Sequence, residues 1–182
     1  GALVALAAGL SGVVALGFLC GLQLGNLHNG LLGLSFAFVG AFVVRHNRDP
    51  DSPGQREGRL FLLCGVAEAA MFSCRQVGYQ PGVPGAEWIA WFGVWPLPLV
   101  MALVGLTIMS FPSGRLPGPL WRRLTVVATA AAIVLATVSA LWPVEYERTA
   151  LLVEHPLALP GGEAAQAFFT VASSIVFLGF QL

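Results

Sequence analysis

Residues 1–44 read GALVALAAGLSGVVALGFLCGLQLGNLHNGLLGLSFAFVGAFVV and contain no Asp, Glu, Lys or Arg. A soluble domain needs charged side chains on its surface, and they usually make up about 25% of its residues. In the whole chain of 182 residues, 57% are hydrophobic and only 10% are charged. Such a stretch can face lipid but cannot cover a water-soluble domain, so the sequence indicates an integral membrane protein.

Six apolar runs follow one another along the chain. A helix that crosses the hydrocarbon core needs roughly 17–25 mostly apolar residues. The runs cover residues 2–22, 29–45, 59–79, 88–111, 124–142 and 164–182. They predict one all-α transmembrane domain over residues 1–182, built as a six-helix bundle. None of the runs shows the alternation typical of a membrane barrel strand. We expect the parent chain to continue beyond residue 182, because the last run stops without a basic flank.

The start of the second run is blurred by Asn26, His28 and Asn29. These side chains could form a tight polar turn in which Asn29 caps the helix. The alternative is a re-entrant hairpin made with the first run. We expect the second run to cross the membrane fully, because both candidate helices have adequate length.

Arginine placement predicts the orientation. Short loops rich in Arg face the cytoplasm. Seven of the nine basic residues, all Arg, lie in or beside the second and fourth links between runs: Arg45, Arg48, Arg56, Arg59, Arg115, Arg122 and Arg123. These two links and both termini are therefore predicted to be cytoplasmic. The expected location is the cell inner (plasma) membrane, with the lipid bilayer as partner.

Aromatic residues and prolines agree with this orientation. Three Trp residues between positions 88 and 95 lie at the outer start of the fourth run, and Trp142 closes the fifth. Trp favours the membrane interface, so anchoring is the simpler interpretation and a ligand-facing aromatic wall is the alternative. Pro96 and Pro98 remove backbone donors near the top of the fourth run and predict a kink there.

The sequence contains no catalytic constellation, and we assign no catalytic, metal or cofactor residues. We place His28, His46 and His155 in different links and expect them to be solvated. Glu154 and His155 are adjacent, but two ligands make a poor metal site. The formal net charge is zero, which gives no reason to expect a nucleic-acid partner.

Two sets of small residues are interpreted through packing. Cys20, Cys64 and Cys74 each lie in an apolar run, without a CxxC pair, and are expected to be small buried hydrophobes. Gly17, Gly21 and Gly25 form two overlapping GxxxG steps. Small residues at that spacing let helices approach closely, and we favour packing within the bundle over dimerisation.

Glu68 and Arg75 lie inside the third run. Glu68 follows Arg59 by nine residues, about 13 Å along a helix, which places it near mid-membrane. Ionisable residues at that depth usually face the bundle interior. The two share a helix face but lie about 10 Å apart along the axis, too far for a direct ion pair. Arg75 is expected to reach outward to the interface.

We expect Glu68 to be neutral and hydrogen-bonded to another helix. It would serve either as a structural bond or as part of a polar cavity or proton-sensitive switch.

The link after the fourth run reads FPSGRLP over residues 111–117 and is followed by WRR at 121–123. Pro112 ends the helix, and Gly114 permits a tight turn. The three arginines can meet lipid phosphates at the inner surface. The candidate residues for lipid contact or coupling are Phe111, Pro112, Gly114, Arg115, Pro117, Trp121, Arg122 and Arg123.

This segment resembles the membrane-sensor region of actinobacterial-type sensor histidine kinases. Those proteins commonly carry FP-(D/T/S)-G-R-x-P with a following W-R between two membrane helices. Residues 155–161, HPLALPG, look like their NPLGLPG-type segment before the last span, with His155 where Asn is expected. The second link departs from their N-x-x-G-W continuation and reads DSPGQ over residues 51–55.

The resemblance implies the input domain of a two-component kinase, with a homodimer formed through the parent kinase. The phosphoacceptor His and the ATP-binding segment would lie beyond residue 182. The signal or ligand is not named by the sequence, and the short links imply that a ligand would bind among helices or short loops. The alternatives are a small transporter or channel subunit and a membrane assembly or scaffold subunit. A transporter would be favoured by inverted internal repeats and several polar groups near the midplane. The sequence shows one midplane carboxylate and no convincing repeat, so the transporter ranks second.

Overall fold

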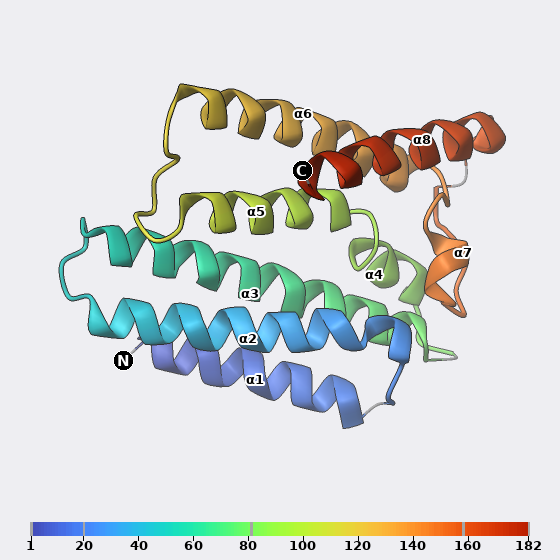
Figure 1. Ribbon diagram of the computed structural model, residues 1–182. Coiled ribbons are helices and arrows are strands. Elements are labelled where there is room, and N and C mark those ends of the chain that lie inside the picture. The colour runs from blue at the N-terminus through green and yellow to red at the C-terminus, as the bar shows by residue number, and fades with distance from the viewer. Residues whose placement is uncertain (1, 20, 81, 158, 182) are drawn as a thin grey trace.

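The computed structural model describes residues 2–19, 21–80, 82–157 and 159–181, apart from the side chains of residues 2–4, 7, 147, 148, 180 and 181. All regular secondary structure in these residues is helical, which confirms the all-α class (Figure 1). The helices are α1 Ala2–Leu19, α2 Leu24–His46, α3 Pro53–Gly78, α4 Ala86–Phe92, α5 Leu97–Ser110, α6 Pro119–Leu141, α7 Tyr146–Thr149 and α8 Gly162–Gln181.

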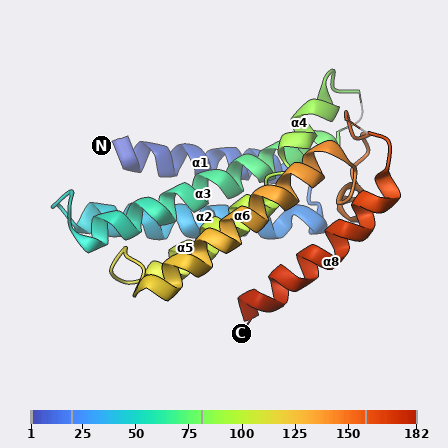
Figure 2. The ribbon, with the colours of Figure 1, turned by 90° about the horizontal axis from the view of Figure 1, so that it is seen from above.

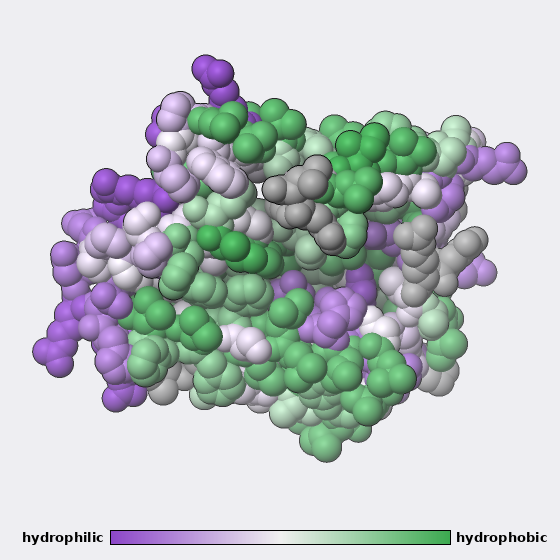
Figure 3. Space-filling model, in the orientation of Figure 1, coloured by the Kyte–Doolittle hydropathy of each residue, from purple (hydrophilic) through white to green (hydrophobic). Residues whose placement is uncertain are grey.

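The long helices run up and down between two ends of the molecule (Figures 1 and 2). The links α2–α3 and α5–α6 lie together at the end where α1 begins. We call this the arginine-rich end, and Figure 3 shows hydrophilic side chains gathered over it. The links after α1, α3 and α6 lie at the opposite end, called the tryptophan-rich end. The predicted grouping of the two Arg-rich links at one end is thus confirmed, while the side of the membrane that they face stays a prediction.

Among the residues that the structure describes, five segments are long and apolar enough to cross a membrane: Leu24–His46, Pro53–Gly78, Ala86–Ser110, Pro119–Leu141 and Gly162–Gly179. Within α1, Ala8–Leu19 forms a shorter apolar segment. The chain is therefore a multi-pass membrane protein with five to six spanning helices. Green, hydrophobic side chains cover most of the middle of the face in Figure 3, as lipid contact requires.

The start of α2 differs from the prediction. The helix begins at Leu24, so Asn26 and Asn29 lie inside it and the expected polar turn with Asn29 as its cap is wrong. The residue at the N-cap position, Gln23, makes no side-chain capping bond. Asn26 instead donates a hydrogen bond to the Phe72 carbonyl of α3, which satisfies its amide inside the bundle. With 23 residues, α2 has the length of a full crossing rather than of a re-entrant arm.

α3 begins six residues earlier than predicted. The Ser52 hydroxyl accepts a hydrogen bond from the Gln55 N–H, and Pro53 occupies the first turn, a common combination at helix starts. The fourth apolar run is divided into α4 and α5 around residues 93–96. Pro96 and Pro98 flank the start of α5, which confirms the predicted kink and its cause.

Of all helix pairs in the described residues, α2 and α3 pack most extensively against each other. A Cβ atom added to Gly65 would lie 2.6 Å from the backbone nitrogen of Ala37, and one added to Gly40 would lie 2.6 Å from that of Leu62. These two glycines therefore let the backbones touch. Of the predicted GxxxG residues, Gly17 packs directly on the Phe72 ring of α3. A Cβ on Gly21 would have no neighbour within 4 Å, so the predicted motif does not act as a unit.

Candidate functional site

One face of α3 carries four buried side chains with polar or ionisable groups. Their spacings of seven, four and seven residues return to the same side of the helix over five turns. Each is at most 4% exposed. The four are Glu57, Cys64, Glu68 and Arg75. This face is the centre of the candidate site.

Glu68 is buried in the bundle interior, as predicted, and is 1% exposed. Its Oε2 atom has no hydrogen-bond partner among the described residues, so that oxygen does not make the expected bond to another helix. A buried polar atom without a hydrogen-bond partner costs free energy. Glu68 therefore leaves one carboxyl oxygen unpaired in the bundle interior.

Arg75 is buried, with 4% of its surface exposed, rather than extended outward as expected. Its Nε donates a 2.6 Å hydrogen bond to the Gly93 carbonyl, which the break between α4 and α5 leaves without a helical partner. The guanidinium also interacts electrostatically with Glu145, Glu68 and two tyrosines, Tyr79 and Tyr146. Arg75 thus joins α3 to the broken helix and to the link that follows α6.

Below these groups on α3, Cys64 contacts α5. The Cys64 sulfur lies 3.3 Å from the Thr107 hydroxyl oxygen, and both residues are fully buried. The interpretation of Cys64 as a small buried side chain is confirmed. Cys74 is partly buried, and Cys20 lies outside the described residues.

Glu57 was not singled out from the sequence, because it lies among the charges of the second link. It is 2% exposed, and its Oε2 accepts a 3.3 Å hydrogen bond from the Ser110 hydroxyl at the end of α5. Its Oε1 has no partner among the described residues. The carboxylate therefore connects the arginine-rich ends of α3 and α5.

The FPSGRLP turn packs on the first turn of α3. Gly114 has φ 65°, a conformation that favours glycine, which confirms the predicted tight turn. A Cβ atom at this position would lie 2.7 Å from the Arg56 Cβ and 3.1 Å from the Pro53 carbonyl oxygen. α5 ends at Ser110 with Phe111 as its C-cap, so Pro112 lies just past the end of the helix, as predicted. The α5–α6 link thus contacts the first turn of α3 through Gly114.

The other residues assigned to this turn point outward. Trp121, Arg122 and Arg123 lie in the first turns of α6 rather than in the link. Seven candidate residues are exposed: Phe111, Pro112, Arg115, Pro117, Trp121, Arg122 and Arg123. Their lipid contact stays a prediction, whereas Gly114 is the member that the structure brings against another helix.

Amide side chains near the tryptophan-rich end join α1, α2 and α3. The Gln76 Nε2 donates hydrogen bonds of 2.6 and 2.8 Å to the carbonyls of Gly17 and Gly21, at the end of α1. The Gln76 Oε1 accepts a bond from Asn26, and Asn29 donates to the Asn26 side chain. The sequence signal was present, since amides are rare in spanning helices, but their partners lie about fifty residues away.

His155 orders the long link before α8. Its Nδ1 accepts a hydrogen bond from the Leu157 N–H, and its Nε2 therefore carries the proton that bonds the Ser139 carbonyl. Burial lowers the pKa of His155, and the bond to the carbonyl partly opposes that shift. The expectation of a solvated side chain is wrong for His155, and His28 lies in α2 rather than in a link. In the described residues, no group of three His, Cys, Asp or Glu side chains could hold a metal ion.

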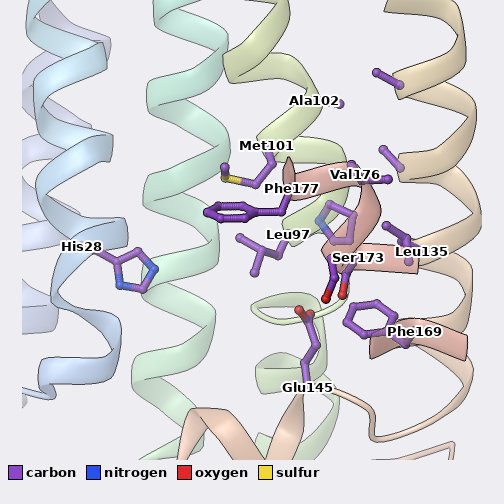
Figure 4. Close-up of a pocket in the computed structure, with 14 residues that line it drawn as sticks. His28, Leu97, Met101, Ala102, Leu135, Glu145, Phe169, Ser173, Val176 and Phe177 are labelled. Carbon is purple, nitrogen blue, oxygen red and sulfur yellow. The ribbon is translucent and has the colours of Figure 1, made fainter. Parts of the chain in front are cut away.

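A cavity of about 470 Å³ lies between α2, α5, α6 and α8 (Figure 4). Most of its wall is apolar. Its polar contributions come from His28, Glu145, Ser173 and Ser174. Figure 4 shows the Glu145 carboxylate and the Ser173 hydroxyl pointing toward the same space. The sequence could not predict this site, because its wall combines four helices and one link.

Comparisons with known proteins do not assign this arrangement. No family model, no curated protein and no solved structure matches the chain. The functional argument therefore rests on the geometry above and on the resemblance carried by the two short segments.

Proposed function

We propose that this chain is the membrane-embedded input domain of a two-component sensor histidine kinase, and that a signal is passed on as a displacement of α8. The observation that carries the proposal is the attachment of α8. In the described part of the chain, α6 is the only helix against which α8 packs extensively. Their contact centres on the buried cluster of Leu135, Val144 and Phe169.

The remaining faces of α8 are free of the bundle. Val171, Ile175 and Leu178 are all exposed. A helix held along one side can slide or rotate without breaking a closely packed core. By contrast, α2 and α3 touch through their glycine backbones, so they provide a rigid reference for such a movement.

The link between α6 and α8 is suited to pass a change into α8. The Trp142 indole N–H donates a 3.0 Å hydrogen bond to the Pro160 carbonyl, which ties the end of α6 to the start of α8. His155 holds the same link to the Ser139 carbonyl of α6. A change in this link would therefore move the first turn of α8.

In each of the two segments that carry the resemblance, one residue stabilises the local turn. In the FPSGRLP turn, Gly114 has the positive φ that favours glycine. In the HPLALPG segment, His155 stands where Asn is expected, and its Nδ1 accepts the N–H two residues later at 3.1 Å. An Asn side chain commonly makes this same local bond, so His replaces it without loss of the turn. Both points support the proposal.

A small transporter or channel subunit is the second candidate. It is favoured by the buried ionisable face of α3, because such residues often mark ion pathways through membranes. Proton flux through liposomes that contain the purified chain would favour this candidate over an input domain.

The test uses the full parent protein in nanodiscs and measures its autophosphorylation. Ala172 packs partly buried against the α6–α8 cluster, so Ala172→Trp should push α8 away and change the rate about tenfold. Ala164→Trp is the matched control, because Ala164 is exposed on the same helix. Equal rates in both variants and the wild type would contradict the role of α8. A parent chain without a phosphoacceptor His and an ATP-binding domain would rule out the kinase.

A further inference from the structure

His155 holds the link before α8 through both nitrogens of its ring. Its Nδ1 accepts a 3.1 Å hydrogen bond from the Leu157 N–H, within the HPLALPG segment. Its Nε2 donates a 3.3 Å bond to the Ser139 carbonyl, near the end of α6. A carbonyl only accepts and an N–H only donates, so a neutral imidazole with its proton on Nε2 is the form that makes both bonds.

A second proton on the ring would change these two bonds in opposite ways. Imidazolium carries a proton on each nitrogen and has no acceptor. The bond to the Ser139 carbonyl would persist and become charge-assisted. Nδ1 would instead present a proton to the Leu157 N–H, so that bond would be lost. His155 would therefore stay on α6 while the chain at Leu157 is released.

We propose that His155 is an acid-sensitive switch in the link: binding of a proton by its ring opens the turn between His155 and Leu157. Pro156 and Pro160 have no N–H, so few backbone donors hold this segment in place. The Leu157 N–H is one of these few, and it would lose its acceptor.

The released segment leads directly into α8 (Figure 1). The Leu159 N–H donates a 3.4 Å bond to a carbonyl at the end of α6, and the Trp142 indole donates to the Pro160 carbonyl at 3.0 Å. Both contacts lie between the turn at Leu157 and the start of α8, so a displacement of the turn acts on them and then on the helix. External acidity would then be the signal, a step that rests on the proposed function and on the predicted outer location of this link.

The titratable and charged groups beside His155, among the described side chains, come from three elements and from its own link. The Tyr146 ring of α7 lies edge-on to the imidazole, with ring centroids 4.8 Å apart. Glu145, before α7, accepts a bond from a serine hydroxyl of α6 and interacts with Arg75 of α3. Glu154 precedes His155 in the chain and is exposed. The carboxylate closest to the buried groups is thus already paired within the bundle.

The pKa of His155 sets the direction of the switch. Burial lowers this pKa from its ordinary value of 6.5, and the bond to the Ser139 carbonyl partly opposes the shift. The ring is therefore neutral at neutral pH, and the turn is closed. Protonation, and with it the opening of the turn, is expected only as the pH falls below about 6.5.

The test is amide hydrogen exchange of the purified chain in nanodiscs at about pH 7.5 and about pH 5, resolved to single residues by mass spectrometry. Exchange is expressed as protection relative to an unstructured peptide at the same pH. We expect the protection of Leu157 to fall about tenfold in acid. Leu152 is the control in the same link, because its N–H bonds to the Gly78 carbonyl of α3 and its protection should not change. Equal protection of Leu157 at both pH values would overturn the switch.

Histidine variants distinguish titration of His155 from a general effect of acid. His155→Asn keeps an acceptor for the N–H two residues later but cannot bind a proton, so Leu157 should stay protected at both pH values. His155→Ala has no acceptor and should lose this protection at both. His46→Asn is the matched control, because the His46 Nδ1 donates to the Phe42 carbonyl, a bond that protonation leaves in place. The fall at Leu157 should persist in that control, and an equal fall in His155→Asn would overturn the assignment to His155.

Autophosphorylation of the full parent protein connects the switch with α8. Its rate should change about tenfold between the two pH values in the wild type and by less than about twofold in His155→Asn. The hydrogen-exchange measurements need no kinase. A parent protein without kinase activity would refute the proposed function and leave the switch intact. An active kinase whose Leu157 amide keeps its protection in acid would refute this inference alone.

Discussion

Gly65→Ala should destabilise the protein, because it adds one methyl group at one of the closest contacts between α2 and α3. The new Cβ atom would lie 2.6 Å from the Ala37 nitrogen and 2.9 Å from the Ala37 Cα. Both atoms belong to the backbone and cannot turn away as a flexible side chain would. Relief therefore requires the two helices to separate by several tenths of an ångström along their main interface.

The magnitude follows from two opposing terms. Overpacking a tight interface costs typically about 1–3 kcal/mol, and backbone-to-backbone contact favours the upper part of that range. Replacing a helical Gly by Ala returns about 1 kcal/mol through helix propensity. The net loss is about 2 kcal/mol in the free energy of unfolding. Gly12→Ala is the control, since a Cβ there meets no atom within 4 Å and only the favourable term applies.

The assay is unfolding in mixed micelles with increasing sodium dodecyl sulfate, followed by helical circular dichroism. Gly65→Ala should unfold at a lower detergent fraction than the wild type, and Gly12→Ala at an equal or higher one. If Gly65→Ala matches the wild type, the close approach of α2 and α3 is wrong, and so is their use as a rigid reference for α8.

Three further predictions concern topology, pH and the buried carboxyl group. Single cysteines at Arg48 and Leu120 should be labelled from the cytoplasmic side, and single cysteines at Gly85 and Thr149 from outside. Because burial lowers the pKa of His155, the unfolded chain binds more protons below about pH 6.5, and stability should fall as pH drops from about 7 to 5. His155→Asn should flatten that dependence of the melting temperature, and an unchanged slope would exclude His155 as its source. Glu68→Gln keeps the shape of the side chain, so stability should change by less than about 1 kcal/mol. Under the proposed function the autophosphorylation of the parent protein should also be retained, and an output that no longer responds to pH would instead make Glu68 a proton-sensitive group.

The spans were predictable because length and apolar composition alone decide them. The helix starts were less predictable, since they depend on where polar side chains find partners. Ser52 and Pro53 are a local signal for a helix start that is visible in the sequence. The predicted start was nevertheless Arg59, because the charged residues before it were assigned to the link. Asn26 looked like a turn residue because its partner, the Phe72 carbonyl, is 46 positions away.

The candidate site divides in the same way. Glu68 could be found because a carboxyl group inside an apolar run is anomalous in itself. Glu57 could not, since an acidic residue beside arginines is ordinary until the fold buries it against Ser110. The cavity was beyond sequence reasoning, because its lining comes from α2, α5, α6, α8 and one link.

The buried face of α3 limits which parts of the bundle can move. At the arginine-rich end, Glu57 bonds to Ser110, and the Gly114 turn rests on Pro53. Toward the other end, Arg75 holds the Gly93 carbonyl between α4 and α5. An ionisable side chain thus ties α3 to the α4–α5 segment near each end, and breaking either tie would leave a buried polar group unpaired, at a cost of about 1–3 kcal/mol. The α3–α5 pair should therefore stay together, and under the proposed function displacement is left to α8 and to its contact with α6.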